Sequence, residues 1–171
     1  MNSTVVFRPA APRDAPGIAI VQAYTWQTAY AGLLPQSILD RRIADVARRA
    51  EQMADSIEKG ERFMAAVWAD TVVGFAAWYP KARSRDFPGD GEIGALYVLK
   101  GFQGRGIGAE LFRLCREALG KEGCRRFLVN CLQGNPAAGF YEKMGGAAAG
   151  RRTDTLADGT EITEIVYRFE V

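Results

Sequence analysis

Residues 96–112 read LYVLKGFQGRGIGAELF, and three glycines fall within positions 104–108 of this stretch. A strand-like segment precedes them and a helix-like segment follows. The first turn of a helix exposes about four unpaired N–H groups and a partial positive charge. Glycine lacks the Cβ that would keep an anion away, and Arg105 adds a positive charge beside it. The stretch therefore predicts an anion held against the backbone; the alternative is a tight turn that only packs closely.

Before the glycines, hydrophobic periodicity predicts six elements. They are a strand at 4–9, helices at 14–31 and 36–59, strands at 62–69 and 71–80, and a strand at 92–98. The two strands around Asp70 are close enough in sequence to form a tight hairpin. Residues 81–91 are polar and contain glycine and proline, which predicts a loop.

After the glycines, Ile107, Leu111, Leu114 and Ala118 have the spacing of a buried helical face. A strand at 125–132, a short helix at 135–144 and two strands around residues 156–159 follow. The order β-α-α-β-β-β-α-β-α-β-β predicts an α/β (α+β) fold, with four helices on the two faces of a mixed, mostly antiparallel seven-stranded sheet. The central strand–helix–strand unit predicts one parallel pair.

The composition is that of an ordinary globular protein. The 171 residues carry a net charge of +2 and fit a single domain spanning 1–171. A charge so close to zero gives no reason to expect nucleic-acid or membrane partners. No run approaches the ~18 apolar residues of a membrane span. Three cysteines without CxxC spacing, and a start unlike a signal peptide, favour a cytoplasmic location.

The chain contains no histidine. This removes the commonest zinc ligand and the catalytic pairs built on histidine, and we expect no metal site. Acid–base chemistry must then use Glu, Asp, Tyr, Lys, Cys or water.

Two nucleotide-binding patterns can be weighed against the glycine stretch. Residues 104–109, GRGIGA, match the dinucleotide pattern G-x-G-x-x-G/A. Such a site has its loop after the first strand and an acid near the end of the next strand. Here the loop follows the fourth predicted strand, and the next strand ends in LVNCLQGN, without an acid. The GK[ST] of a P-loop is also absent, so neither pattern is complete.

The same stretch resembles the acyl-CoA-binding segment of the GNAT superfamily of N-acyltransferases, whose signature is Q/R-x-x-G-x-G/A. Gln103, Gly106 and Gly108 stand at the signature positions. Downstream, NPAAGFYEKMGG at 135–146 is similar to the next family motif, an Asn followed by a helix ending in Phe-Tyr-x-x-x-Gly. WQTAYAGLLP at 26–35 resembles the first-helix region of a branch of small bacterial members. The order of elements agrees with the family as well.

The resemblance implies that the anion is the pyrophosphate of coenzyme A. The pantetheine arm would lie where the strand at 92–98 splays from the strand at 125–131, pairing with main chain like an added strand. One amide of that main chain would stabilise the oxyanion of the reaction. The implied donor-binding residues are Leu96, Tyr97, Val98, Gln103, Gly104, Arg105, Gly106, Ile107, Gly108, Ala109, Asn135 and Tyr141.

In the family, the position of Tyr141 supplies the acid that protonates the departing thiolate. A phenol with a pKa near 10 is protonated at neutral pH, which suits this role. The alternative is that Phe140 and Tyr141 only pack a helix end. Asn135 precedes Pro136, so it also fits a helix N-cap, a role compatible with contacting pantetheine.

Glu92 is the candidate general base. It stands eleven residues before Gln103, the offset at which a branch of the family carries a catalytic glutamate. Strand alternation would place it on one face with Gly94, Leu96 and Val98, at a distance that calls for a water relay. The alternative is a solvated acid at the start of a strand.

The acceptor side is less defined by the sequence. Trp26, Tyr30 and Trp78, together with Tyr79, are candidates for an aromatic wall around an amine. Apolar residues at those spacings are otherwise core. No cluster of acids marks a polyamine channel, and no peptide groove is visible.

The resemblance thus implies an acyl-CoA-dependent N-acetyltransferase. It would transfer acetyl from acetyl-CoA to a primary amine of a small molecule or peptide, by direct attack in a ternary complex. The alternatives are another short acyl-CoA donor and a non-catalytic acyl-CoA-binding sensor or scaffold. Family members often dimerise, so a homodimer is a further expectation.

Overall fold

The computed structural model describes residues 4–83, 86–87 and 90–171. The strands are β1 (Val6–Pro9), β2 (Arg62–Trp68), β3 (Thr71–Tyr79), β4 (Gly91–Val98), β5 (Arg126–Leu132), β6 (Ala147–Thr155) and β7 (Glu161–Glu170). The α-helices are α1 (Ala15–Ala29), α2 (Gln36–Ala44), α3 (Val46–Glu58), α4 (Ile107–Lys121) and α5 (Ala137–Lys143). Two short 3-10 turns, η1 (Pro12–Asp14) and η2 (Lys100–Phe102), precede α1 and α4. Part of the predicted 81–91 loop, at 84–85 and 88–89, lies outside the described residues.

All seven strands form one sheet in the order β1-β2-β3-β4-β5-β7-β6. Every neighbouring pair is antiparallel except β4 and β5, which are parallel. This confirms the predicted fold class, a mixed and mostly antiparallel sheet with helices on both faces.

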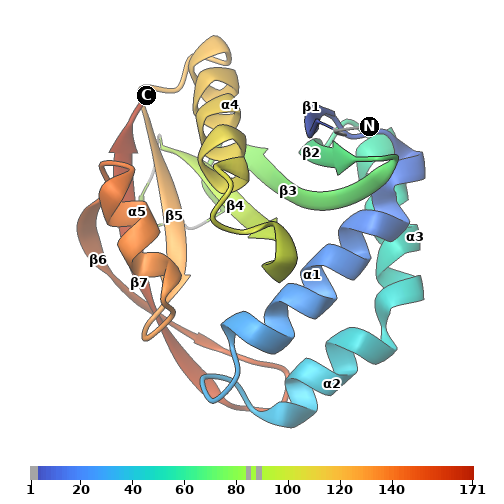
Figure 1. Ribbon diagram of the computed structural model, residues 1–171. Coiled ribbons are helices and arrows are strands. Elements are labelled where there is room, and N and C mark those ends of the chain that lie inside the picture. Colours follow the sequence, from blue (N-terminus) through green and yellow to red (C-terminus); the bar gives the residue numbers. More distant parts are fainter. Residues whose placement is uncertain (1–3, 84–85, 88–89) are drawn as a thin grey trace.

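The parallel pair is joined over only two residue pairs, Gly91 with Phe127 and Glu92 with Leu128. Beyond them the two strands diverge (Figure 1), while β4 stays paired with β3 on its other edge as far as Val98. The β5-facing edge of β4 therefore leaves main-chain groups without a strand partner. The expected splay of the central parallel pair is confirmed.

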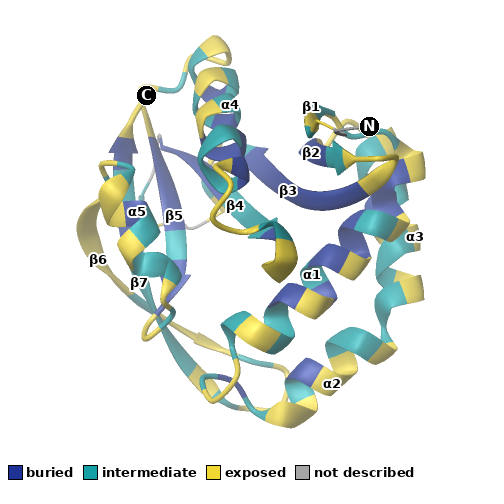
Figure 2. Cartoon of the chain, in the orientation of Figure 1, coloured by how far each residue is buried: buried dark blue, intermediate teal, exposed yellow. Residues whose placement is uncertain are grey.

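Helices cover the two faces of the sheet with separate cores. α4 and α5 pack on one face, where Leu111, Phe112 and Phe127 are fully buried. α1 and α3 pack on the other face, around Ile18 and Phe75. Figure 2 shows β3 and most of β5 buried and the edge strand β6 largely exposed. Because both faces of the central strands are covered, β3 needs a nearly continuous apolar sequence.

The β2–β3 hairpin turns at Ala69 and Asp70, both with positive φ (45° and 62°). Two consecutive left-handed residues are the hallmark of a two-residue type I′ turn, whose twist matches that of the flanking strands. The predicted tight hairpin is confirmed.

The helix predicted at 36–59 is two helices, so the described residues contain five α-helices rather than four. The break falls at Asp45, whose N–H still donates to Arg41 O while its own carbonyl accepts from Arg49 N–H. The carboxylate of Asp45 then lies at the positive N-terminal end of α3 and binds Arg48 at 2.6 Å. Periodicity missed the break because the apolar spacing continues across it.

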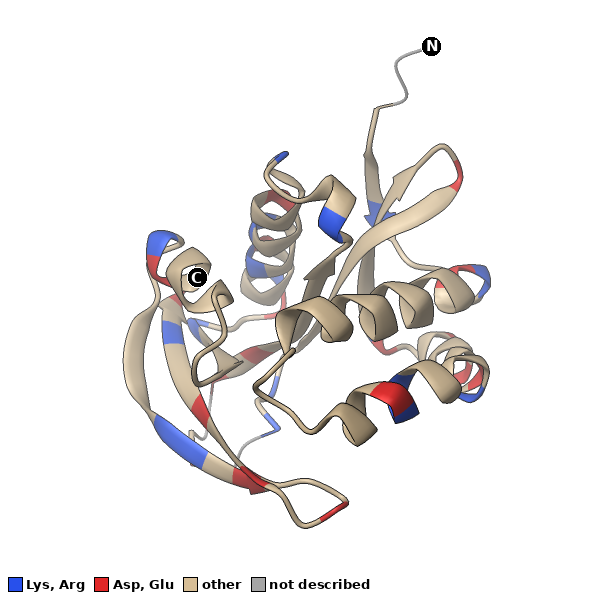
Figure 3. Cartoon of the chain, turned by 60° about the horizontal axis from the view of Figure 1, so that its bottom comes forward, with Lys and Arg blue, Asp and Glu red and all other residues tan. Residues whose placement is uncertain are grey.

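Charged residues of both signs are interspersed along the chain (Figure 3), in keeping with the net charge of +2. In the part of the chain that the structure describes, none of the helices combines the length and apolar character that a membrane crossing requires.

Candidate functional site

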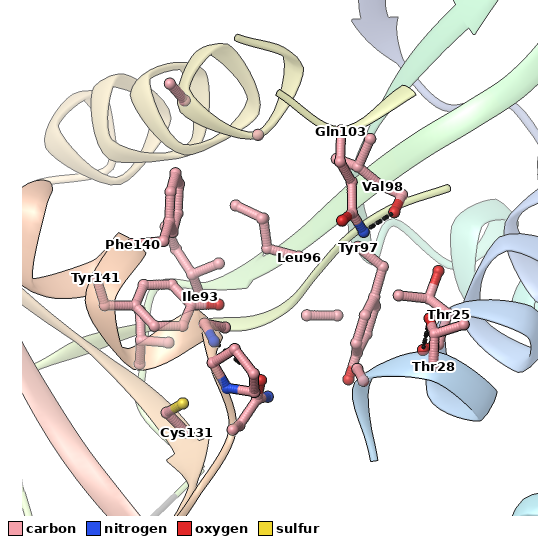
Figure 4. Close-up of a pocket in the computed structure, with 18 of the residues that line it drawn as sticks. Thr25, Thr28, Ile93, Leu96, Tyr97, Val98, Gln103, Cys131, Phe140 and Tyr141 are labelled. Carbon is pink, nitrogen blue, oxygen red and sulfur yellow. Dashed lines mark hydrogen bonds between the residues drawn. The ribbon is translucent and has the colours of Figure 1, made fainter. Parts of the chain in front are cut away.

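A cavity of about 720 Å³ opens where β4 and β5 diverge. Its walls come from α1, β4, the loop and first turn of α4, β5 and α5. The lining residues include Thr25, Thr28, Tyr30, Ile93, Gly94, Ala95, Leu96, Tyr97, Val98, Gln103, Gly104, Gly106, Gly108, Ala109, Asn130, Cys131, Asn135, Phe140 and Tyr141. In Figure 4, Tyr141 and Cys131 lie on one side of the cavity and Tyr97 and Thr25 on the other, with Leu96 between them. The splay thus brings both sequence motifs to one space.

The glycine loop needs its glycines for backbone conformation. Gly104 and Gly106 have φ of 72° and 79°, in the left-handed region that strains other residues. A Cβ built on either would meet nothing within 4 Å, so the space before the loop is open. α4 begins directly after Gly106, and its first N–H groups have no partner within the helix. This arrangement suits an anion at the helix N-terminus.

Gln103 anchors the loop to β4. Its Nε2 donates to Val98 O at 2.9 Å, as Figure 4 shows. The bond fixes the loop beside the free edge of the strand. Of the other predicted donor-binding residues, Ile107 is buried in the core, and the guanidinium of Arg105 lies over the Phe102 ring at 5.1 Å. Arg105 and Ile107 do not line the cavity, and their contact with the donor stays a prediction.

Tyr141 enters the cavity from α5. Its ring is buried and packs edge-on against Phe140, with centroids 5.3 Å apart. Burial, followed by the neighbouring Tyr97 and Cys131, raises the pKa of Tyr141 above its usual value near 10. The hydroxyl therefore stays protonated at neutral pH. It has no hydrogen-bond partner among the described residues, so it is available to a ligand.

Two asparagines line the same cavity. Asn135 Oδ1 accepts the Ala137 N–H at 3.0 Å, which confirms its predicted capping role at α5. Asn130 was not predicted from the sequence. Its Oδ1 is buried without a partner in the described part of the chain, and a ligand N–H would satisfy it. A sequence signal for Asn130 exists, because this polar residue interrupts the apolar run FLVNCL of a buried strand.

The α1 side of the cavity carries hydroxyl groups. The hydroxyls of Tyr30 and Tyr97 lie 3.2 Å apart, linking the end of α1 to β4. Thr25 and Thr28 line the wall beside them. Trp26 packs edge-on against Tyr30 with centroids 5.0 Å apart, and Arg42 lies 3.9 Å from the Trp26 ring centroid. Tyr30 therefore lines the cavity, and Trp26 packs against the Tyr30 ring without lining the cavity.

Glu92 is separated from the cavity. Gly94 has no partner on β3, because Ala77 pairs with Ala95 and Trp78 with Ile93. This bulge inverts the alternation of side chains along β4. Glu92 was predicted to share a face with Leu96 and Val98, and it lies on the opposite face. Its side chain is 3% exposed and both carboxylate oxygens bind Arg83. These bonds favour a structural role, and the base role remains a prediction.

Trp78 is also placed away from the cavity. Its indole is buried in the α4-side core, and its Nε1 donates to Glu122 Oε1 at 3.1 Å. Side-chain alternation along β3 turns Trp78 toward α4 rather than toward α1, so its acceptor role stays a prediction that the cavity lining does not support. Tyr79, the next residue, faces the α1 side and lines a second cavity.

The cysteines show no sign of activation. Burial raises the pKa of Cys115 to about 12 and that of Cys131 to about 11. A thiol with such a pKa is a poor nucleophile at neutral pH. Within the ranges the structure describes, His, Cys, Asp and Glu form no group of three that could hold a metal ion.

Solved structures share this fold of a seven-stranded sheet covered by helices on both faces. One such structure is the PaiA N-acetyltransferase of Thermoplasma acidophilum in complex with coenzyme A. It aligns with a TM-score of 0.73 at 16% identity, over 98% of this chain and 99% of that chain. The likeness shows the fold alone.

The chain belongs to the Acetyltransferase (GNAT) family, whose model matches residues 23–146. It is 30% identical over 138 residues to the uncharacterized N-acetyltransferase YuaI of Bacillus subtilis (strain 168), covering 81% of this chain and 78% of that protein. It is 28% identical over 169 residues to the probable N-acetyltransferase Rv2775 of Mycobacterium tuberculosis (strain ATCC 25618 / H37Rv), covering 97% and 94% respectively.

Proposed function

We propose that the protein is an N-acetyltransferase that transfers acetyl from acetyl-CoA to a primary amine within a ternary complex. The observation that carries this proposal is the cavity at the β4–β5 splay, because it joins three requirements in one space. It has a helix N-terminus for a pyrophosphate, a free strand edge for an amide-containing arm, and a protonated Tyr141. The chain would act as one domain, residues 1–171.

The donor would bind along the loop and then along β4. Backbone amides from Gly104 to Ala109 suit the pyrophosphate, since an anion there gains the helix dipole and several N–H donors. The two amides of pantetheine would pair with the unpartnered edge of β4 around Leu96 and Val98. Asn130 and Asn135 offer further polar groups along that path.

The chemical step is aminolysis of a thioester. The neutral amine attacks the acetyl carbonyl carbon, and a β4 amide stabilises the resulting oxyanion. The C–S bond then breaks, and Tyr141 gives its proton to the departing thiolate. The amine loses its extra proton to water, and Tyr141 is reprotonated from solvent. Glu92 is left out of this scheme because Arg83 occupies both of its oxygens.

The three free cysteine thiols fit the proposed cytoplasmic location, because the cytoplasm keeps thiols reduced. A small molecule or a peptide is the proposed acceptor class.

The first test is thermal denaturation with and without acetyl-CoA. A ligand at 100 times its Kd stabilises the folded state by about 2.7 kcal/mol, so a clear rise in Tm is expected. NAD at the same concentration should give none. A rise with acetyl-CoA, but no thiol release with any amine, would identify a sensor instead of an enzyme. No shift with any CoA ester would refute the donor site itself.

A further inference from the structure

A second cavity of about 270 Å³ adjoins the first one on the α1 and α3 side of the sheet. Gly94 and Ala95 of β4 line both cavities, so the two spaces share part of a wall at the strand that would hold the thioester. The polar side chains around the second cavity are Gln22, Arg49, Gln52, Ser56, Glu61, Tyr79 and Arg83. A polar cavity between a helix and a sheet is unusual, because that interface is normally apolar.

Arg49 supplies the inner positive charge of this cavity. It is half-buried, and its Nε and Nη2 donate to Gln22 Oε1 at 3.1 and 2.8 Å. An amide oxygen accepts these bonds without neutralising the charge. No carboxylate is bonded to Arg49 among the described residues. Its neighbour Arg48, by contrast, points to solvent and binds Asp45 at 2.6 Å.

Arg42, in α2, is a second half-buried arginine without a bonded carboxylate among the described residues. It stacks on Trp26. Burial, followed by repulsion from Arg49, lowers the pKa of Arg42 to about 10. Burial also lowers the pKa of Arg49, and Arg48 adds to this effect. The Asp45 carboxylate attracts both guanidinium groups but forms its ion pair with Arg48. Arg49, which unlike Arg42 lines the second cavity, therefore has no directly bonded counter-ion among the described residues.

The remaining charges do not supply one. Arg83 is held by Glu92, and Glu61 is an exposed side chain at the rim, where solvent screens its charge. Arginine has five N–H donors in a planar fork that matches carboxylate and phosphate oxygens. Two donors of Arg49 are used by Gln22, so the rest remain for a ligand in the cavity.

We propose that the second cavity binds an anionic group of the acceptor at Arg49, so that the substrate is an amine carrying a carboxylate or phosphate. This inference rests on the proposed function. The acceptor would reach from the first cavity to the second past their shared wall, with its amine at β4 near Ala95 and its anionic oxygens at Arg49. Simple alkylamines and polyamines lack that group and would be poor acceptors.

The test compares acceptors that differ only in the anionic group. β-Alanine is paired with n-propylamine, and O-phosphoethanolamine with ethanolamine, in a thiol-release assay with acetyl-CoA. The kcat/KM for at least one anionic member should exceed that of its neutral partner by about tenfold or more, the range of a charge-assisted hydrogen bond. Which pair shows the larger ratio distinguishes carboxylate from phosphate. Equal or higher values for both neutral amines would overturn the proposal.

Variants assign the effect to the arginine. Arg49→Gln should abolish the preference while the KM for acetyl-CoA stays unchanged, and Arg49→Lys should restore part of it. Arg48→Gln is the matched control and should leave the preference intact, because Arg48 is exposed and bound to Asp45. A preference that survives in Arg49→Gln refutes the assignment.

A second readout separates this proposal from the proposed function. Calorimetry measures binding of β-alanine and O-phosphoethanolamine to the wild type and to Arg49→Gln in the presence of coenzyme A. If no amine supports thiol release but an anionic amine binds through Arg49, the catalytic proposal fails and the anion site stands. If neither compound binds the wild type, the anion site is refuted whatever the turnover.

Discussion

Arg83 and Glu92 are joined by three hydrogen bonds across the start of β4. Arg83 Nη2 and Nε lie 2.7 and 3.2 Å from Glu92 Oε1, and the Arg83 backbone N–H lies 2.8 Å from Oε2. The guanidinium also covers Gly94, where a Cβ would come within 2.5 Å of Nη2. The pair fixes the chain after β3 against β4, and Arg83 lines the second cavity.

The first prediction follows from that bonding. Glu92→Gln should lower the free energy of unfolding by about 2 kcal/mol, because an amide cannot accept both charge-assisted bonds. The kcat of the folded variant should stay within about threefold of the wild type, under roughly 1 kcal/mol of barrier. Urea denaturation and steady-state kinetics measure the two effects. Glu117→Gln, an exposed acid on α4, is the control for stability.

The opposite pattern would identify Glu92 as a general base. In that case kcat would fall by about 100-fold or more, with little change in unfolding free energy and the loss of an acidic limb in the pH–rate profile.

The second prediction concerns Tyr141. Tyr141→Phe should reduce kcat by about 100-fold, the usual contribution of a positioned acid, while the KM for acetyl-CoA changes little. Stability should be nearly unchanged, because the hydroxyl has no partner to lose among the described residues. Full turnover at saturating substrates in the variant would show that another group, or water, protonates the thiolate.

The third prediction is the stability of the protein at alkaline pH. Burial raises the folded-state pKa values of Tyr141 and Tyr30 above the unfolded value near 10. The folded state then holds these protons longer than the unfolded state. Stability should therefore fall as pH rises through about 10, by roughly 1.4 kcal/mol per pH unit for each such tyrosine. Denaturant titrations between pH 8 and about 11 measure this slope, which should be shallower in Tyr141→Phe. Equal slopes in the two proteins would contradict the buried placement of the ring.

The fourth prediction separates backbone strain from ligand binding in the glycine loop. Gly106→Ala and Gly123→Ala both place a Cβ at a left-handed φ, 79° and 85°, with open space around it. Each should cost roughly 1–2 kcal/mol of stability. Only Gly106 lines the donor cavity, so only Gly106→Ala should also weaken acetyl-CoA binding, by about tenfold for one charge-assisted contact. If calorimetry finds equal affinities for acetyl-CoA in the two variants, the proposal that this loop binds the pyrophosphate is refuted.

The fifth prediction concerns Asp14, at the start of α1. The hydrogen bonds from Arg8 lower the pKa of Asp14, and the Ala11 N–H adds to this effect. Stability from this carboxylate is thus present above its unfolded pKa of about 3.9 and is lost as pH falls through the lower folded value. Asp14→Asn should destabilise the protein by roughly 1.5–3 kcal/mol at pH 7 and by less at pH 3. A difference that does not shrink in acid would show that packing, rather than charge, is lost.

Most of the fold could be predicted from the sequence, because its local patterns agree with its topology. The alternation of strands and helices, the spacing of Ile107 and Leu111, and the closeness of β2 to β3 each point to the same sheet. The helix break at Asp45 could not be predicted, since nothing in the apolar spacing marks it.

The donor side of the site was predictable for the same reason that the fold was. Two motifs, at 103–108 and 135–146, flank one opening, and the structure lines the cavity with both. The acceptor side was not predictable, because it depends on which face of the sheet each strand residue points to. One unpaired residue, Gly94, reverses the facing of Glu92, and the only sign of that bulge in the sequence is the glycine itself, within an otherwise regular strand pattern. The role proposed for Arg49 depends on its having no bonded carboxylate among the described residues, which only three-dimensional contacts reveal.

The most direct test of the proposed function is amine-dependent release of the coenzyme A thiol, measured with acetyl-CoA and a panel of primary amines, with the acetylated product identified by mass. The proposal predicts that at least one amine raises thiol release well above the hydrolysis background, yields the N-acetyl amide in equal amount, and does so about 100-fold more slowly in Tyr141→Phe. Stabilisation by acetyl-CoA with no amide formed from any amine would contradict the proposal.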